Sequence, residues 1–152
     1  MSDWIRLDPQ RIAATGREQR KDRGIEVSVS LSPYDVPEAV RGYFDSKLDR
    51  FVIEFSYIGN EAWELHRQDD QIQLRIGKTS GRIYGLEIEV SSLRDRAVEL
   101  EMRLPKMLSK AIDHELSDAQ SRKFSASNYK IAKDVIYSER LPLFASLPSV
   151  LR

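Results

Sequence analysis

The segment RIGKTSGRIYG, residues 75–85, contains the nearest approach to a phosphate-binding motif in the chain. Gly77-Lys78-Thr79 matches the end of a P-loop, in which backbone N–H groups and a lysine cradle phosphate. That loop also requires a glycine five residues before Gly77, and the residue there is Ile72. The residues after the motif alternate as in a strand, whereas a P-loop leads into a helix. The sequence therefore predicts an exposed hairpin tip here and no nucleotide site.

A row of polar side chains across a predicted sheet is the second candidate: Glu54, His66, Gln73 and Glu87. Neighbouring strands lie about 4.8 Å apart, so a carboxylate at Glu54 beside His66 would raise the histidine pKa and form an acid–base pair. Arg75 in the adjoining row would complete a small catalytic site. An enzyme that uses Glu54, His66 and Arg75 on the polar sheet face stays open as one alternative. A solvated sheet face with modest charge pairing explains the same residues without activity.

Arg67 is predicted to lie on the apolar face of the sheet, together with Trp63 and Tyr84. At the end of its strand the side chain can reach the rim and keep its charge in water. The alternative is a cleft between the sheet and the helix beginning near Leu93, where Arg67 meets an anionic group and Trp63 lines the wall. A small-molecule-binding domain therefore stays open as a second alternative.

No set of residues predicts a metal ion or a cofactor. The chain has no cysteine, which excludes thiolate nucleophiles, disulfides and cysteine zinc sites. His114 and Asp118 lie one helical turn apart and could share an ion, but two ligands do not make a site. No G-x-S-x-G stretch presents a serine on a nucleophile elbow. We therefore predict no metal and no cofactor, and catalytic residues stay unassigned.

Hydrophobic periodicity predicts the elements that must position these residues. Apolar residues at every second position predict a strand over 25–31, and helical spacing predicts a helix over 40–50. Alternation returns over 51–90, where turn residues divide the segment into successive strands that form a meander. A helical stripe follows over 93–112, with a second helix over 128–137. The apolar tail after it is predicted to pack on the body or on a partner.

Loop lengths predict the register of the meander, because a slip of one residue would turn a strand inside out. The loops at 59–61, 69–70 and 79–81 set three pairs: Tyr57 with Trp63, Leu65 with Leu74, and Leu74 with Leu86. Gly81 falls where the last loop requires a positive φ. These pairs place one apolar set on the face that packs against helices and leave the polar set on the other face.

Length and composition predict one compact body. With 152 residues, 41% of them hydrophobic, the chain can bury a single sizeable core. The order of elements predicts an α+β fold, a five-stranded, mainly antiparallel sheet with helices packed on one face. Residues 1–24 are predicted to form a basic arm or a short helix, and residues 25–152 a single domain.

Charge and hydropathy exclude several partners. Basic and acidic side chains cancel at 24 each, and residues 25–93 carry 12 acidic against 7 basic ones. Nucleic acid is an unfavourable partner for the sheet, because its binding requires positive charge. No run approaches the roughly 18 apolar residues of a membrane span, so we predict a cytoplasmic protein without a membrane partner.

These observations favour a non-catalytic interaction module, an adaptor or regulator, over the two alternatives above. A protein partner or self-association as a homodimer is expected, and a small-molecule ligand is the alternative. The candidate binding residues are Glu54, Trp63, His66, Arg67, Gln73 and Arg75.

Overall fold

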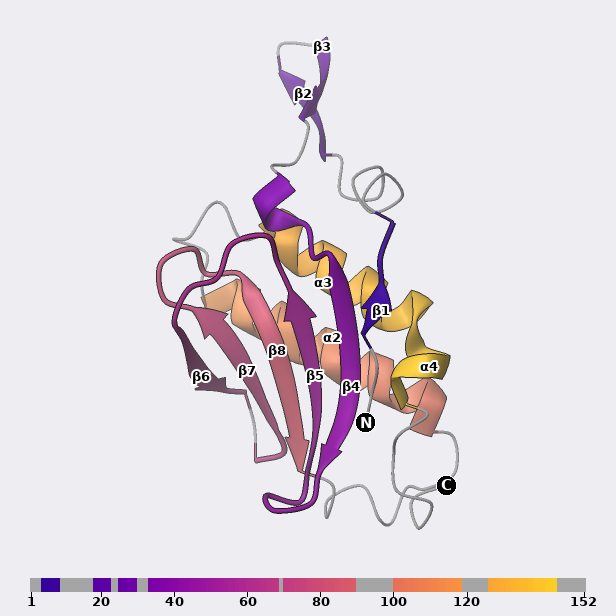
Figure 1. Ribbon diagram of the computed structural model, residues 1–152. Helices are drawn as coiled ribbons and strands as arrows, with labels where there is room; N and C mark the ends of the chain where they lie inside the picture. The colour runs from indigo at the N-terminus through magenta and orange to yellow at the C-terminus, as the bar shows by residue number, and fades with distance from the viewer. Residues whose placement is uncertain are drawn as a thin grey trace.

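A sheet with helices on one of its faces forms the body of the protein in the computed structural model (Figure 1). The polypeptide that the structure describes comprises residues 4–8, 18–22, 25–29, 33–68, 70–89, 100–118 and 126–144. Within these stretches, no helix is long and apolar enough to cross a membrane.

The sheet has 6 strands in the order β1-β4-β5-β8-β7-β6, and every neighbouring pair is antiparallel. The strands are β1 Ile5–Arg6, β4 Ala39–Asp45, β5 Arg50–Ser56, β6 Trp63–Arg67, β7 Ile72–Gly77 and β8 Ile83–Glu89. The predicted α+β class and antiparallel sheet are confirmed, with one strand more than the sequence suggested.

In the described stretches, three helices cover one face of this sheet (Figure 1). They are α2 Leu100–Asp118, α3 Ala126–Ser138 and α4 Arg140–Phe144, and a 3-10 turn, η1 Pro33–Asp35, precedes β4. The predicted helical stripe is confirmed in α2, where Leu104, Leu108 and Ile112 are fully buried. Part of the apolar tail packs on the body as predicted, since Leu143 and Phe144 in α4 are buried. Residues 145–152 lie outside the described stretches.

The helix predicted over 40–50 was wrong, because this segment is the strand β4. It pairs with β5 along its whole length, from Ala39 opposite Ser56 to Asp45 opposite Arg50. The sequence AVRGYFD satisfies helical spacing and strand alternation at once, and its aromatic and β-branched residues favour a strand. Pairing with a buried neighbour decided between the two.

The strand predicted over 25–31 is present as β3 Ile25–Val29, but it lies outside the main sheet. It pairs with β2 Glu18–Asp22 in a separate 2-stranded sheet. Of the two alternatives predicted for residues 1–24, a basic arm or a short helix, the helix is therefore wrong at residues 18–22, and residues 9–17 lie outside the described stretches. The division into an arm, 1–24, and a domain, 25–152, stays a prediction.

The predicted meander was wrong at β5 and β6. β5 pairs with β8, and the chain after β5 crosses to the far edge to form β6 (Figure 1). The register of β6 on β7 also differs by one residue, because His66 and not Leu65 lies opposite Leu74. One residue of slip reverses the faces of a strand, so Trp63 and Leu65 face away from the helices.

The register of β7 on β8 was predicted correctly for most of its length. Leu74 lies opposite Leu86, with Gln73 opposite Glu87, as the loop length indicated. Gly81 has a φ of 75°, the left-handed conformation expected of it. A bulge after Arg75 shifts the pairing at the loop end of this hairpin.

Candidate functional site

The sheet face opposite the helices, here called the open face, carries a network of paired charges. Its members are three arginines and two glutamates from four strands, here called the charge belt: Arg41, Arg50, Glu54, Arg75 and Glu87. Arg75 Nε donates to Glu87 Oε2 at 2.9 Å, and Arg50 Nη1 donates to Glu87 Oε1 at 3.0 Å. Glu54 accepts from Arg41 Nη2 at 3.0 Å and lies 3.7 Å from Arg75 Nη1.

The charge belt is more buried than an ordinary surface ion pair. Glu87 is only 6% exposed, and a buried carboxylate of this kind is retained when cations satisfy both of its oxygens. Burial lowers the pKa of Arg75, but hydrogen bonding to Glu87 and the charges of Glu87 and Glu54 outweigh it and leave that pKa raised. Arg75 therefore stays charged at neutral pH.

Gly85 allows the charge belt to cross the sheet. It lies between Glu54 on β5 and Arg75 on β7. A Cβ there would stand 2.6 Å from the Ile53 carbonyl oxygen and 3.0 Å from Arg75 Cδ. The missing side chain leaves the space through which Arg75 reaches Glu54, so a side chain of the protein itself occupies the space above Gly85.

Aromatic rings lie at both ends of the charge belt. The guanidinium of Arg41 lies 4.4 Å from the ring centroid of Trp4, and that of Arg75 lies 4.5 Å from the ring of Trp63. Both distances suit cation–π attraction. Burial first, and then hydrogen bonding to Glu54, raises the pKa of Tyr43, so its hydroxyl stays protonated. Through Arg75, the charge belt contacts Trp63 on the edge strand β6.

His66 lies on the opposite face of the sheet, between two carboxylates. Its Nδ1 contacts Glu115 on α2, and its Nε2 lies 2.9 Å from Glu64. Burial lowers the pKa of His66, but its hydrogen bonds to Glu64 and Glu115 outweigh burial and raise it. Both ring nitrogens face acceptors, so the protonated ring fits the site. Gln68 also donates to Glu115 at 2.6 Å, and together these contacts tie β6 to α2.

Replacing His66 with glutamine is expected to remove a pH-dependent part of the stability. Because the pKa of His66 is raised, its contribution to stability is fully present below the pKa of the unfolded chain, about 6.5. It is lost as the pH rises through the pKa of the folded protein. We expect a loss near pH 6 of about 1 kcal/mol, because the ring is partly exposed, and a smaller loss near pH 9. Urea unfolding of both proteins at each pH measures it. A constant difference across this range would contradict the assignment, and Glu64→Gln should remove part of the same pH dependence.

Sequence reasoning placed Arg67 on the apolar face, and the structure corrects this. Arg67 is exposed and shares the open face with Trp63 and Leu65, because the register of β6 is shifted. It lies opposite Gln73, which in turn lies opposite Glu87. The small-molecule alternative required Trp63 and Arg67 to line the space between the sheet and the helices, and they do not.

The predicted catalytic row is not assembled. Glu54 and Arg75 meet on the open face, whereas His66 faces α2 from the edge strand. The predicted contact of Glu54 with His66 was wrong because β8 and β7 lie between β5 and β6. Sequence reasoning also missed Arg41, whose alternation with its neighbours in β4 was the available signal.

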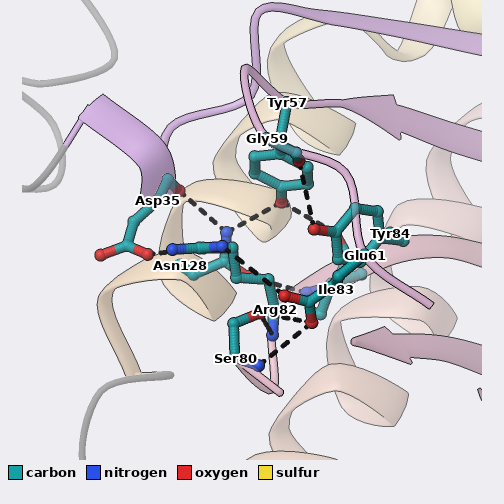
Figure 2. A network of polar contacts seen from close by, with 9 residues as sticks. All are labelled: Asp35, Tyr57, Gly59, Glu61, Ser80, Arg82, Ile83, Tyr84 and Asn128. Carbon is teal, nitrogen blue, oxygen red and sulfur yellow. Dashed lines mark hydrogen bonds and ion pairs between the residues drawn. The ribbon is translucent and has the colours of Figure 1, made fainter. Parts of the chain in front are cut away.

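A second polar network, shown in Figure 2, joins the helices to the loops at one end of the sheet. Asn128, only 1% exposed, donates to the Asp35 carbonyl at 2.9 Å and to the Tyr57 hydroxyl at 2.8 Å. Its amide oxygen accepts the Ile83 N–H at 2.9 Å. Burial raises the pKa of Tyr57 far above its usual range, and the hydroxyl donates to the Ile83 carbonyl at 2.7 Å. Each of these polar atoms has a partner, which indicates a structural role.

The same network continues to the tip of the β7–β8 hairpin (Figure 2). Arg82 donates to Asp35 at 2.7 Å, and Glu61 accepts from the backbone and the hydroxyl of Ser80 at 3.0 and 2.9 Å. Lys78 lies in this hairpin, which joins the strands β7 and β8 as predicted, whereas a phosphate-binding loop would lead into a helix. Among the side chains that the structure describes, no three histidines or carboxylates are placed to hold a metal ion.

No protein-family model, curated protein or solved structure matches the chain.

Proposed function

We propose that the protein is a non-catalytic interaction module that binds a protein through the edge strand β6. The observation that carries the proposal is the direction of the backbone groups in this strand. In the part of the chain that the structure describes, β6 has a neighbour, β7, on one side only. A strand edge of this kind can pair with a strand from another chain.

The hydrogen bonds to β7 determine which backbone groups point away from it. The backbone N–H of Lys78 donates to the Ala62 carbonyl, and the backbone N–H of Gln68 donates to the Ile72 carbonyl. Ala62 and Gln68 flank β6 at its two ends. Because such pairs alternate in an antiparallel ladder, the even-numbered residues of β6 bond to β7. The N–H and C=O groups of the odd-numbered residues point outward. An added strand would therefore bond to Trp63, Leu65 and Arg67.

The side chains at this edge also support a protein partner. Trp63 is 40% exposed and Leu65 is 45% exposed, and both lie on the open face. Charged residues often protect an exposed edge, and Glu64 and Arg67 lie in this one, but the edge also presents a tryptophan and a leucine to solvent. The stack of Arg75 on Trp63 holds the indole in place, so little side-chain entropy would be lost on binding.

Charge pairing favours protein over nucleic acid as the partner. The three arginines of the charge belt contact Glu54 and Glu87, which neutralise most of their charge. A phosphate backbone binds to cations that can displace its counterions. The belt therefore offers such a backbone only one net positive charge, whereas the edge of β6 offers hydrogen bonds to a polypeptide.

Site-specific photo-crosslinking in the host cell tests this proposal. A photoreactive phenylalanine replaces Leu65 or Arg67, and the control positions are Leu48 and Leu141, which are exposed apolar residues elsewhere. We expect a discrete protein adduct from the two β6 positions and none from the controls. Adducts at all positions alike, or no adduct from β6, would overturn the proposal.

A further inference from the structure

The edge strand reads Trp63-Glu64-Leu65-His66-Arg67, and this order is complementary to its own reverse. We infer that the partner of β6 is a second copy of the same chain, paired antiparallel about a two-fold axis through Leu65. The inference rests on the proposed function, since it uses the same edge and names what occupies it. Figure 1 shows β6 at the end of the sheet, where such pairing would join two sheets into one.

Backbone geometry permits this pairing. With the axis at Leu65, each odd-numbered residue of one copy faces an odd-numbered residue of the other. These are the residues whose N–H and C=O groups point away from β7, as the bonds of Lys78 and Gln68 establish. Leu65 would exchange both backbone bonds with the partner's Leu65, and Trp63 would do the same with the partner's Arg67.

Side-chain chemistry gives the pairing its complementarity. Glu64 faces the partner's His66, a carboxylate against an imidazole whose pKa its own neighbours already raise. This is a pair without direct backbone bonds, in which opposing side chains approach most closely. On the open face, the partner's Arg67 reaches Trp63, whose ring already takes Arg75 as a cationic neighbour. At the axis, Leu65 would pack against the partner's Leu65.

Neighbouring symmetric registers lack these matches. Moving the axis to Glu64 sets two carboxylates against each other, and moving it to His66 opposes two protonated rings. Like charges directly opposite one another destabilise a strand pair. Only the axis at Leu65 pairs all five residues of the strand and opposes unlike charges, so the same residues that favour one register also exclude the alternatives.

A short strand buries little area, so the dimer is expected to be weak. Interfaces at the small end of the known range are transient. We expect a dissociation constant on the order of 10 μM, corresponding to about −7 kcal/mol. The dimer is thus expected in sedimentation velocity at about 100 μM protein and largely dissociated at about 1 μM.

Opposite charges placed at the axis provide the decisive test. Leu65→Lys and Leu65→Glu each put like charges against themselves in the proposed dimer. Each variant alone is expected to be monomeric at a concentration where the wild type dimerises, with an affinity at least about tenfold lower. A mixture of the two in equal amounts is expected to recover the dimer, because lysine then faces glutamate. Leu65 is half-exposed, so both variants should fold, which near-ultraviolet circular dichroism checks.

The absence of cysteine in the sequence allows a second test of the register. Leu65→Cys introduces a single thiol at the axis, and Leu48→Cys introduces one at an exposed position away from β6. A short bismaleimide should join two chains of the first variant and not of the second. Equal linking of both variants would overturn the inference, as would a wild-type monomer at about 1 mM or a dimer that persists in both charge variants.

These tests separate the dimer from the broader proposal. A monomeric wild type whose photoreactive position 65 captures a different protein overturns the homodimer and leaves the interaction module standing. A monomer that yields no adduct at β6 overturns both.

Discussion

Replacing Asn128 with leucine is expected to lower the free energy of unfolding by about 4 kcal/mol. The side chain is buried and makes three hydrogen bonds, to Asp35, Tyr57 and Ile83. Leucine has a similar shape but leaves the Ile83 N–H and the Asp35 carbonyl without this partner. An orphaned buried polar group costs about 1–3 kcal/mol, and here several are orphaned together. Urea unfolding monitored by fluorescence measures the loss.

Asn128→Asp distinguishes the hydrogen-bond account from a simple packing defect. The aspartate keeps an acceptor for the Ile83 N–H but replaces the amide donor to Asp35 and Tyr57. Burial raises the pKa of such a carboxyl, so its cost is greatest above that pKa and falls as pH drops and the group regains a donor hydrogen. A loss that is independent of pH relative to the wild type would contradict this account.

Tyr57→Phe and Lys130→Ala serve as graded controls for the same network. The first removes one hydroxyl that donates to the Ile83 carbonyl and accepts from Asn128, and we expect a loss of about 1.5 kcal/mol. The second changes an exposed residue on the same helix, and its effect should stay within about 0.5 kcal/mol. If Asn128→Leu costs no more than Lys130→Ala, the network does not hold α3 against the sheet.

Local turn chemistry allowed part of the candidate site to be predicted from sequence. The loop at 79–81, with glycine at the position of positive φ, fixed β7 against β8 and so placed Arg75 beside Gly85. The helices could be predicted for the same reason, because their apolar stripes are local patterns. Local patterns therefore predicted β7, β8, α2 and α3, but they assigned a helix to the segment that forms β4.

The choice of neighbours for β5 was not local and could not be read from alternation. Phe51 and Ile53 in β5 are fully buried, so β5 needs a neighbouring strand on each side. The alternation of apolar residues is compatible with either β6 or β8 as one of these neighbours. Pairing with β8 left β6 at the edge, where an alternating strand does not have to bury its apolar residues. The apolar side chains of Trp63 and Leu65 were therefore assigned to the core, and the exposed edge on which the proposed function rests was missed.

β4 was misassigned for a related reason, and the predicted helix over 40–50 included two of the five residues of the charge belt. Arg41 and Arg50 were placed in or beside a predicted helix, so they could not be set against Glu54 and Glu87. Glycine at position 42 was the strongest signal against the helix, since glycine disfavours a helix interior. The reason for a glycine at position 42 becomes clear only from the structure, in which α4 packs against it.

Gly42→Ala is expected to destabilise the protein by about 3 kcal/mol through overpacking. A Cβ at this position would lie 2.5 Å from the Leu143 carbonyl oxygen and 2.8 Å from Phe51 Cζ. The carbonyl belongs to the backbone of α4, and the ring of Phe51 packs against Phe144 at 5.7 Å, so neither neighbour can move freely. Urea unfolding measures the loss, and hydrogen exchange should show α4 opening more readily than α2.

Gly59→Ala is the matched control, because its Cβ would meet only Tyr34 at 3.8 Å, an ordinary contact. An equal effect of the two substitutions would contradict the steric account of Gly42. Adding Phe51→Leu to Gly42→Ala removes the ring atom that obstructs the new methyl group. The double variant should therefore lose at least about 0.5 kcal/mol less than the two single losses combined. Strict additivity would mean that the α4 backbone alone resists the methyl group, and the ring contact would then have no part in it.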